Sequence, residues 1–141
     1  MYQQIVKTKE QAILHLFFHC CYKDGDFGEE ELKMVSDIIV SIGLDKVLNL
    51  KEEIQTYKAY KGSIKDESLF LSFIIKTISP MQKLALFSFC AELFLSDKNV
   101  TLSEEVLINK IASMLYIKPS DSKTIQDLVC QLHAVQHTKV F

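Results

Sequence analysis

Two acidic segments of the sequence share one spacing of carboxylates. The first runs from Asp24 to Glu31 and the second from Asp97 to Glu104, with an apolar residue three positions after each aspartate. Carboxylate oxygens are the ligands that calcium, magnesium and manganese prefer, whereas zinc favours nitrogen and sulfur donors. If the two segments lie side by side in the fold, their four carboxylates form a site for one of these hard cations.

The acidic segments lie within a longer internal repeat. The apolar positions of residues 11–44 recur in residues 84–117, so that Leu14 aligns with Phe87 and Ile38 with Ile111. Similarity at a fixed separation is the signature of a duplicated unit, and two copies are too few for a stacked array. The repeat therefore predicts two pseudo-symmetric helix–loop–helix halves within a single domain that spans residues 1–141.

Apolar periodicity and capping residues predict an all-α fold, a compact bundle of about seven helices. Asp66 is the predicted N-cap of one helix, and Ser79, Pro80 and Gln82 have the pattern of another capped helix start, with proline at the first helical position. No segment shows the alternation of a strand. We expect helices over residues 6–23, 29–43, 45–62, 66–78, 79–95, 102–116 and 120–137, and the first and fifth, apolar nearly all round, should be central.

Helix capping offers a second explanation of the glutamates. Thr101 and Glu104 have the spacing of a capping box, and Gly28 and Glu31 are the matching residues of the first copy. Capping explains the aspartates less well, because a carboxylate at the C-terminal end of a helix opposes the helix dipole, and a bound cation would reverse that penalty. An EF-hand is excluded, since the glycine and glutamate required at its sixth and twelfth loop positions are missing.

The pattern DGxFxxxE of residues 24–31 resembles the signature of the tellurite-resistance TerB-like family, which includes the N-terminal domain of DjlA-type cochaperones. The resemblance covers about residues 11–132. It implies an all-helical domain of two halves whose Asp and Glu residues form a metal-binding centre, with a role in stress systems. Lys23 and Ser96 replace the alanine of the signature, and Lys98, which replaces a glycine, adds a positive charge beside the second segment.

Two histidine pairs have the four-residue spacing that can chelate zinc: His15 with His19, and His133 with His137. Neither pair carries the adjacent glutamate of a zinc-protease motif, so the first pair is interpreted as a polar stripe on a central helix. His19 aligns with Glu92 in the repeat, and these two residues are candidate auxiliary ligands of the carboxylate centre. Without a phosphate loop, nucleophile elbow or Cys–His–Asp set, the chain is not expected to be an enzyme.

Composition sets the remaining expectations. The formal net charge is −2, and all 16 basic residues are lysine, which argues against nucleic-acid binding. The four cysteines are irregularly spaced, and no segment resembles a signal peptide or a membrane span. We expect a cytoplasmic accessory or scaffold protein that binds a protein partner or forms a homo-oligomer. The alternative is a metal-independent protein–protein interaction domain in which the acidic residues only cap helices.

Overall fold

The structure is a computed structural model that describes residues 1–22, 28–95 and 101–136. This part of the chain is all-α, as predicted, with eight α-helices, two short 3-10 turns and no strand. The α-helices are α1 (Tyr2–Ile5), α2 (Lys9–Tyr22), α3 (Glu29–Ser41), α4 (Leu50–Tyr60), α5 (Glu67–Ile78), α6 (Lys83–Leu95), α7 (Leu102–Met114) and α8 (Pro119–Gln136), and the 3-10 turns are Leu44–Lys46 and Lys61–Ser63. None of the helices in these ranges is long and apolar enough to cross a membrane.

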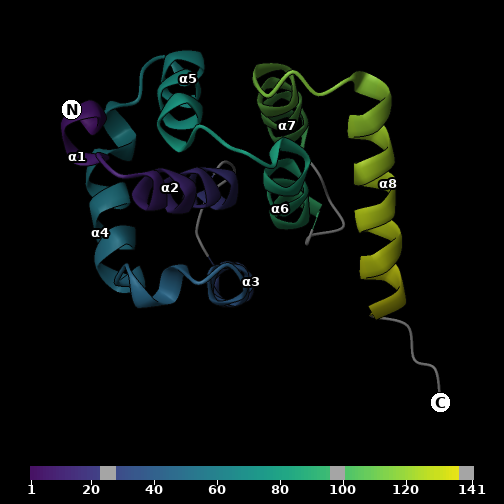
Figure 1. Ribbon diagram of the computed structural model, residues 1–141, viewed down its shortest axis with the longest axis horizontal. Coiled ribbons are helices and arrows are strands. Elements are labelled where there is room, and N and C mark those ends of the chain that lie inside the picture. The colour runs from purple at the N-terminus through teal and green to yellow at the C-terminus, as the bar shows by residue number, and fades with distance from the viewer. Residues whose placement is uncertain (23–27, 96–100, 137–141) are drawn as a thin grey trace.

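Helices α2 and α6 pack against each other at the centre of the bundle (Figure 1). Helices α4 and α5 cover α2, while α7 and α8 pack on α6, and α3 contacts both central helices. Helix α5 also packs against α7. The central position of α2 follows from its sequence: Leu14, Leu16, Phe17 and Phe18 are all fully buried, and a helix that is apolar all round must be enclosed by others.

Local capping residues explain where several helices begin. Asp66 caps α5 as predicted, and its Oδ1 accepts a hydrogen bond of 3.2 Å from the backbone N–H of Leu69. Asn49 caps α4 in the same way through a 3.1 Å bond from the N–H of Glu52. Helix α4 therefore begins later than predicted, after a 3-10 turn that follows Gly43, whose φ of 79° lies in the left-handed region.

The helix start predicted at Ser79 is wrong, because this residue ends α5 instead. Ser79 has a φ of 46°, and its N–H donates to the carbonyl of Ile75 at 2.9 Å, as at a helix C-terminus. Pro80 then lies just beyond the helix, where its ring cannot disturb the helical hydrogen bonds. Helix α6 begins only at Lys83. The predicted first helix also begins later than expected, at Lys9 of α2, because Val6 is extended, and the short helix α1 precedes it.

Candidate functional site

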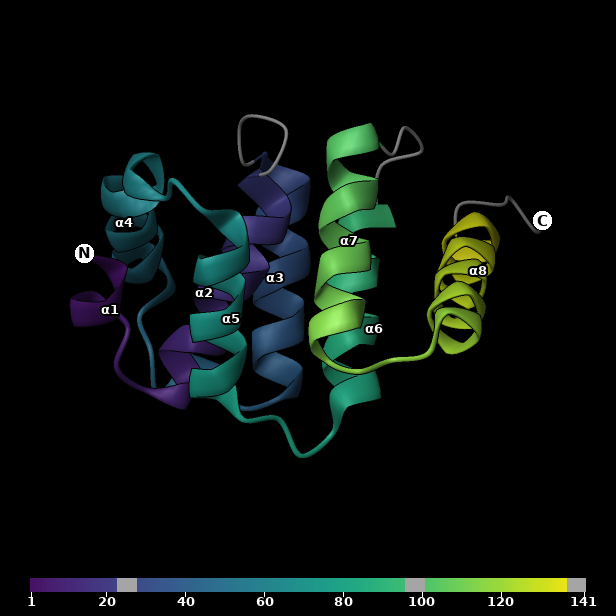
Figure 2. The same cartoon turned by 90° about the horizontal axis from the view of Figure 1, so that it is seen from above.

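The structure describes two of the four predicted carboxylates. Asp24 and Asp97 lie outside the described residues, whereas Glu31 and Glu104 each occupy the third position of a helix, α3 and α7 respectively. Figure 2 shows that α3 and α7 both begin at the same edge of the bundle. The positions predicted for Asp24 and Asp97 beside these glutamates therefore stay predictions.

Glu104 belongs to the capping box that the sequence predicts. The N–H of Glu104 donates to Thr101 Oγ1 at 3.2 Å, and the N–H of Thr101 donates to Glu104 Oε1, also at 3.2 Å. Two backbone donors that the helix cannot satisfy internally are thus paired at the start of α7. Capping therefore accounts for the position of this carboxylate near α7, whatever else the carboxylate does.

Glu31 is folded back over the start of α3. Gly28 is the N-cap of α3, with no side chain to form a cap hydrogen bond, and a Cβ atom at Gly28 would lie only 2.6 Å from Glu31 Oε2. The carboxylate thus occupies space that any side chain larger than hydrogen would fill. Glycine at this position lets an acidic group sit against the backbone at the positive end of the helix dipole.

Both glutamates influence the pKa of the Cys21 thiol. Burial raises the pKa of this thiol, and the charges of Glu31, the neighbouring Cys90 and Glu104 raise it further. A carboxylate has this effect because its negative charge disfavours a thiolate nearby. The glutamates of the two acidic segments therefore act on a single side chain near the C-terminal end of α2.

The donor set in this region suits a hard cation in kind, because carboxylate oxygens are the ligands such cations take. Within the described ranges, no group of three or more His, Cys, Asp and Glu side chains is arranged to hold a metal ion. The two glutamates alone supply fewer ligands than calcium or magnesium requires. Asp24 and Asp97 would have to supply the others.

His19, predicted as an auxiliary ligand, has both ring nitrogens engaged elsewhere. Its Nδ1 lies 2.9 Å from the hydroxyl of Tyr57, and its Nε2 lies 2.9 Å from Glu67 Oε2. Neither nitrogen is therefore directed at Glu31 or Glu104 in this structure. Glu92, the other predicted auxiliary residue, is partly buried on α6, and burial raises the pKa of its carboxyl.

His15 forms a second chain of the same kind, one helical turn before His19. Its Nδ1 is hydrogen-bonded to the hydroxyl of Tyr60, and its Nε2 lies 2.8 Å from Glu53 Oε1. Burial lowers the pKa of His15, while the hydrogen bond and charge of Glu53 oppose that shift. A neutral imidazole fits these contacts, since Nε2–H donates to the carboxylate and Nδ1 accepts from the phenol.

The two carboxylate–imidazole–phenol chains were missed by sequence reasoning, although a signal was available. Glu53, Tyr57 and Tyr60 are spaced four and three residues apart, which places them on one face of α4. That face meets the histidine face of α2, since α2 and α4 are packed together. Glu67 of α5 completes the second chain, and its Oε1 also receives a 3.3 Å ion pair from Lys110 of α7. The first histidine pair is thus a polar stripe on a central helix, as predicted, and the structure shows that this stripe is buried. The second pair includes His137, which lies outside the described residues.

All four cysteines are free thiols in the structure. Cys20 of α2 and Cys90 of α6 are buried and lie close to each other where the two central helices meet. Burial, followed by the contact with Cys90, raises the pKa of Cys20 well above its ordinary value. A thiol held in its protonated form is a poor nucleophile and a poor metal ligand, so Cys20 serves as a core side chain.

The arrangement defines a class of protein: an all-helical module in which two helices begin with acidic residues that act on one central helix. A family model described as tellurite resistance protein TerB matches residues 10–127, which is most of the chain. The chain therefore belongs to the TerB family. The comparisons with curated proteins and with solved structures gave no match.

Proposed function

We propose that this protein is a non-enzymatic TerB-family module that binds a divalent cation through Asp24, Glu31, Asp97 and Glu104 and serves as an accessory or scaffold in a stress response. The observation that supports the proposal is that Glu31 and Glu104 lie in the first turns of α3 and α7, which begin at the same edge of the bundle (Figure 2), and both carboxylates raise the pKa of Cys21. Carboxylates from two segments far apart in sequence act on one side chain, and such convergence is what a two-segment cation site requires.

The physical argument concerns repulsion between like charges. Carboxylates gathered at one edge of a bundle repel each other, and a divalent cation converts that repulsion into attraction. Helix dipoles stabilise Glu31 and Glu104 where they are, but they do not stabilise an aspartate that follows the C-terminal end of a helix. Calcium, magnesium and manganese are the cations that an all-oxygen donor set favours, with zinc less suited.

Isothermal titration calorimetry with calcium, magnesium, manganese and zinc tests the proposal. The wild-type chain is compared with Asp24→Asn/Asp97→Asn and with Glu31→Gln/Glu104→Gln. Glutamine can still serve in a capping box, so the second variant removes charge while keeping the helix start. Glu30→Gln/Glu105→Gln is the matched control, because both residues are exposed acids at the same helix starts.

We expect saturable binding in the wild type and the control and its loss in both other variants. Cation at about a hundred times its dissociation constant should also add about 2.7 kcal/mol to the free energy of unfolding. Absence of binding in the wild type would refute the proposal, as would binding that persists in Asp24→Asn/Asp97→Asn.

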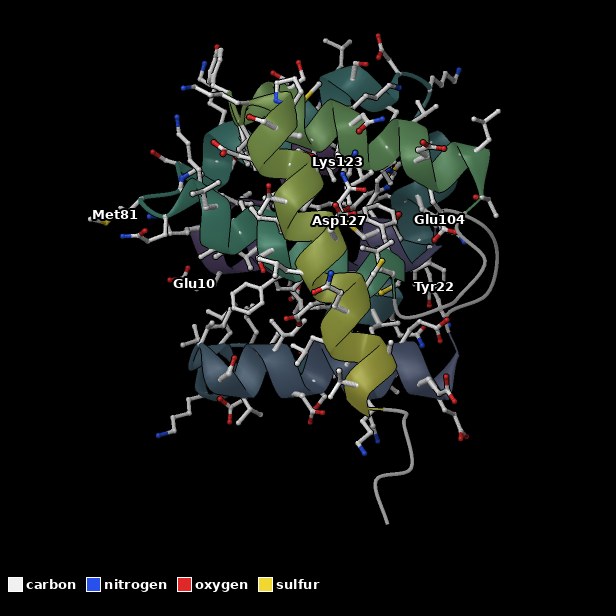
Figure 3. All side chains as sticks on the ribbon, turned by 90° about the vertical axis from the view of Figure 1, so that its right-hand side faces the viewer. Glu10, Tyr22, Met81, Glu104, Lys123 and Asp127 are labelled. Atoms are coloured by element: carbon white, nitrogen blue, oxygen red, sulfur yellow. The ribbon has the colours of Figure 1, made fainter. Side chains whose placement is uncertain are left out.

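An apolar groove favours a second candidate function, a metal-independent interaction domain in which the acids only cap helices. A cavity of about 310 Å³ is lined largely by apolar side chains of α2, α6, the end of α5 and the segment between α5 and α6, among them Phe17, Ile78 and Phe89. Met81 borders this cavity and is 92% exposed. Figure 3 shows Met81 projecting from one end of the bundle, with Glu104 toward the other end.

The occupant that this geometry favours is a second copy of the chain. A projecting side chain beside a groove makes the patch self-complementary, which is the condition for a two-fold symmetric contact. Sedimentation equilibrium should then show a dimer that Met81→Asp dissociates, while Leu102→Asp at the other exposed end leaves it intact. A wild-type chain that is monomeric at all concentrations would rule out this candidate.

A further inference from the structure

A second cavity, of about 340 Å³, opens between the C-terminal end of α4 and the start of α5. Its inner side is formed by His19 and Tyr57, which are buried, and by Glu67. Lys61 and Lys65, both exposed, line it as well, together with the partly buried Ile64. This cavity is distinct from the acidic helix starts and from the groove beside Met81.

The charges around this cavity favour an anion. Among the described residues that line the cavity, Glu67 is the one carboxylate, and Lys110 of α7 already offsets its charge at 3.3 Å. Lys61 and Lys65 form no ion pair with any residue that the structure describes. Lys61 Nζ lies 4.5 Å from the ring centroid of Tyr22, which also lines the cavity. This cation–π contact holds the ammonium group at the cavity without neutralising it.

Helix geometry adds to the preference for an anion. Glu67 is the first residue of α5, a helix of 12 residues, so the cavity borders the positive end of the α5 dipole. Asp66, next to it, is directed at its own helix, because its Oδ1 accepts from the N–H of Leu69. The C-terminal end of α4 would by itself favour a nearby lysine such as Lys61, but that dipole effect fades within a turn and does not account for Lys65.

We propose that this cavity binds a small phosphorylated molecule, whose phosphate group lies between Lys61 and Lys65 and whose organic part covers Ile64. Two ammonium groups and a helix N-terminus match a dianionic group better than a monocarboxylate, since each lysine acts as a point charge toward phosphate. The apolar Ile64 gives the organic part a surface to cover. This inference does not depend on cation binding or on self-association.

Titration of the ¹⁵N-labelled chain by NMR, at near-physiological ionic strength, tests the inference with four probes: phenyl phosphate, inorganic phosphate, sulfate and acetate. We expect saturable shifts of amides in residues 57–69 with phenyl phosphate, weaker binding of inorganic phosphate, and the weakest binding of acetate. Lys61→Gln/Lys65→Gln should weaken phenyl phosphate binding by about tenfold or more. The matched control, Lys33→Gln/Lys76→Gln, removes two exposed lysines elsewhere and should bind as the wild type does.

Several outcomes would overturn the inference. These are the absence of saturable binding in the wild type, equal affinity for phenyl phosphate and sulfate, equal affinity for phosphate and acetate, and an equal loss of affinity in the control. If the double variant fails to fold, as judged by its thermal melt, Lys65→Gln alone serves instead, because Lys65 makes no hydrogen bond or ion pair through its side chain with any described residue.

Discussion

Replacement of Tyr60 by phenylalanine tests whether the buried chain of Glu53, His15 and Tyr60 stabilises the fold. Tyr60 and His15 are both fully buried, and their rings are stacked with centroids 5.5 Å apart. Tyr60→Phe keeps this ring stack and removes only the hydroxyl that is hydrogen-bonded to His15 Nδ1. The substitution therefore leaves a buried imidazole nitrogen without its partner.

The expected loss is about 1–3 kcal/mol in the free energy of unfolding, which is the desolvation penalty of one unsatisfied buried polar group. Urea unfolding at neutral pH, followed by circular dichroism, measures this difference against a total stability of about 5–15 kcal/mol. Tyr116→Phe is the matched control, because Tyr116 is 86% exposed. The control should change stability by less than about 0.5 kcal/mol.

A double-mutant cycle shows whether the effect comes from the hydrogen bond itself. His15→Leu removes the partner, so Tyr60→Phe made in that background should cost less than it does alone, with a coupling energy of about 0.5–3 kcal/mol. A Tyr60→Phe variant as stable as the Tyr116→Phe control would refute the reasoning. Strict additivity of the two substitutions would also contradict it, because contacting partners should be coupled.

Three further predictions concern pH, capping and the core. Burial lowers the pKa of His15 below its ordinary value of 6.5, so at acidic pH the unfolded chain binds more protons than the folded chain. The free energy of unfolding should therefore fall as the pH drops below about 6.5, by at most about 1.4 kcal/mol per pH unit. Urea unfolding of His15→Gln should show a shallower dependence on pH. Thr101→Ala should cost about 1 kcal/mol through loss of the capping box, whereas Thr101→Ser should retain most of that energy. Phe17→Ala should cost about 3–5 kcal/mol, visible as a lowered urea midpoint, because the ring is fully buried.

Helix starts that depend on one local residue could be predicted from sequence. Asp66, Thr101 and Gly28 cap the helices that the sequence assigns to them, because a cap needs only its own side chain and the next turn. Ser79 shows the limit of this reasoning. The same residue types suit the end of one helix and the start of the next, and in the structure Ser79 has the left-handed conformation of a helix C-cap.

The part of the candidate site that depends on helix caps could also be predicted from the sequence. Glu31 and Glu104 lie at the predicted helix positions because those positions follow from the caps. The chains through His15 and His19 were not predictable in the same way, since their hydrogen bonds join residues 38 to 48 positions apart. Such contacts depend on which helices become neighbours, and periodicity within a single helix does not determine that.

The position of Glu67 has a consequence for the cooperativity of the molecule. One of its oxygens is bound to His19 of α2 and the other to Lys110 of α7, so a single carboxylate joins helices from opposite ends of the chain. A fluctuation that releases α7 from α5 also removes the cation that offsets the charge beside His19. Local opening of the early part of the chain is therefore coupled to local opening of the late part, because movement of either part weakens the contacts of Glu67 that stabilise the other.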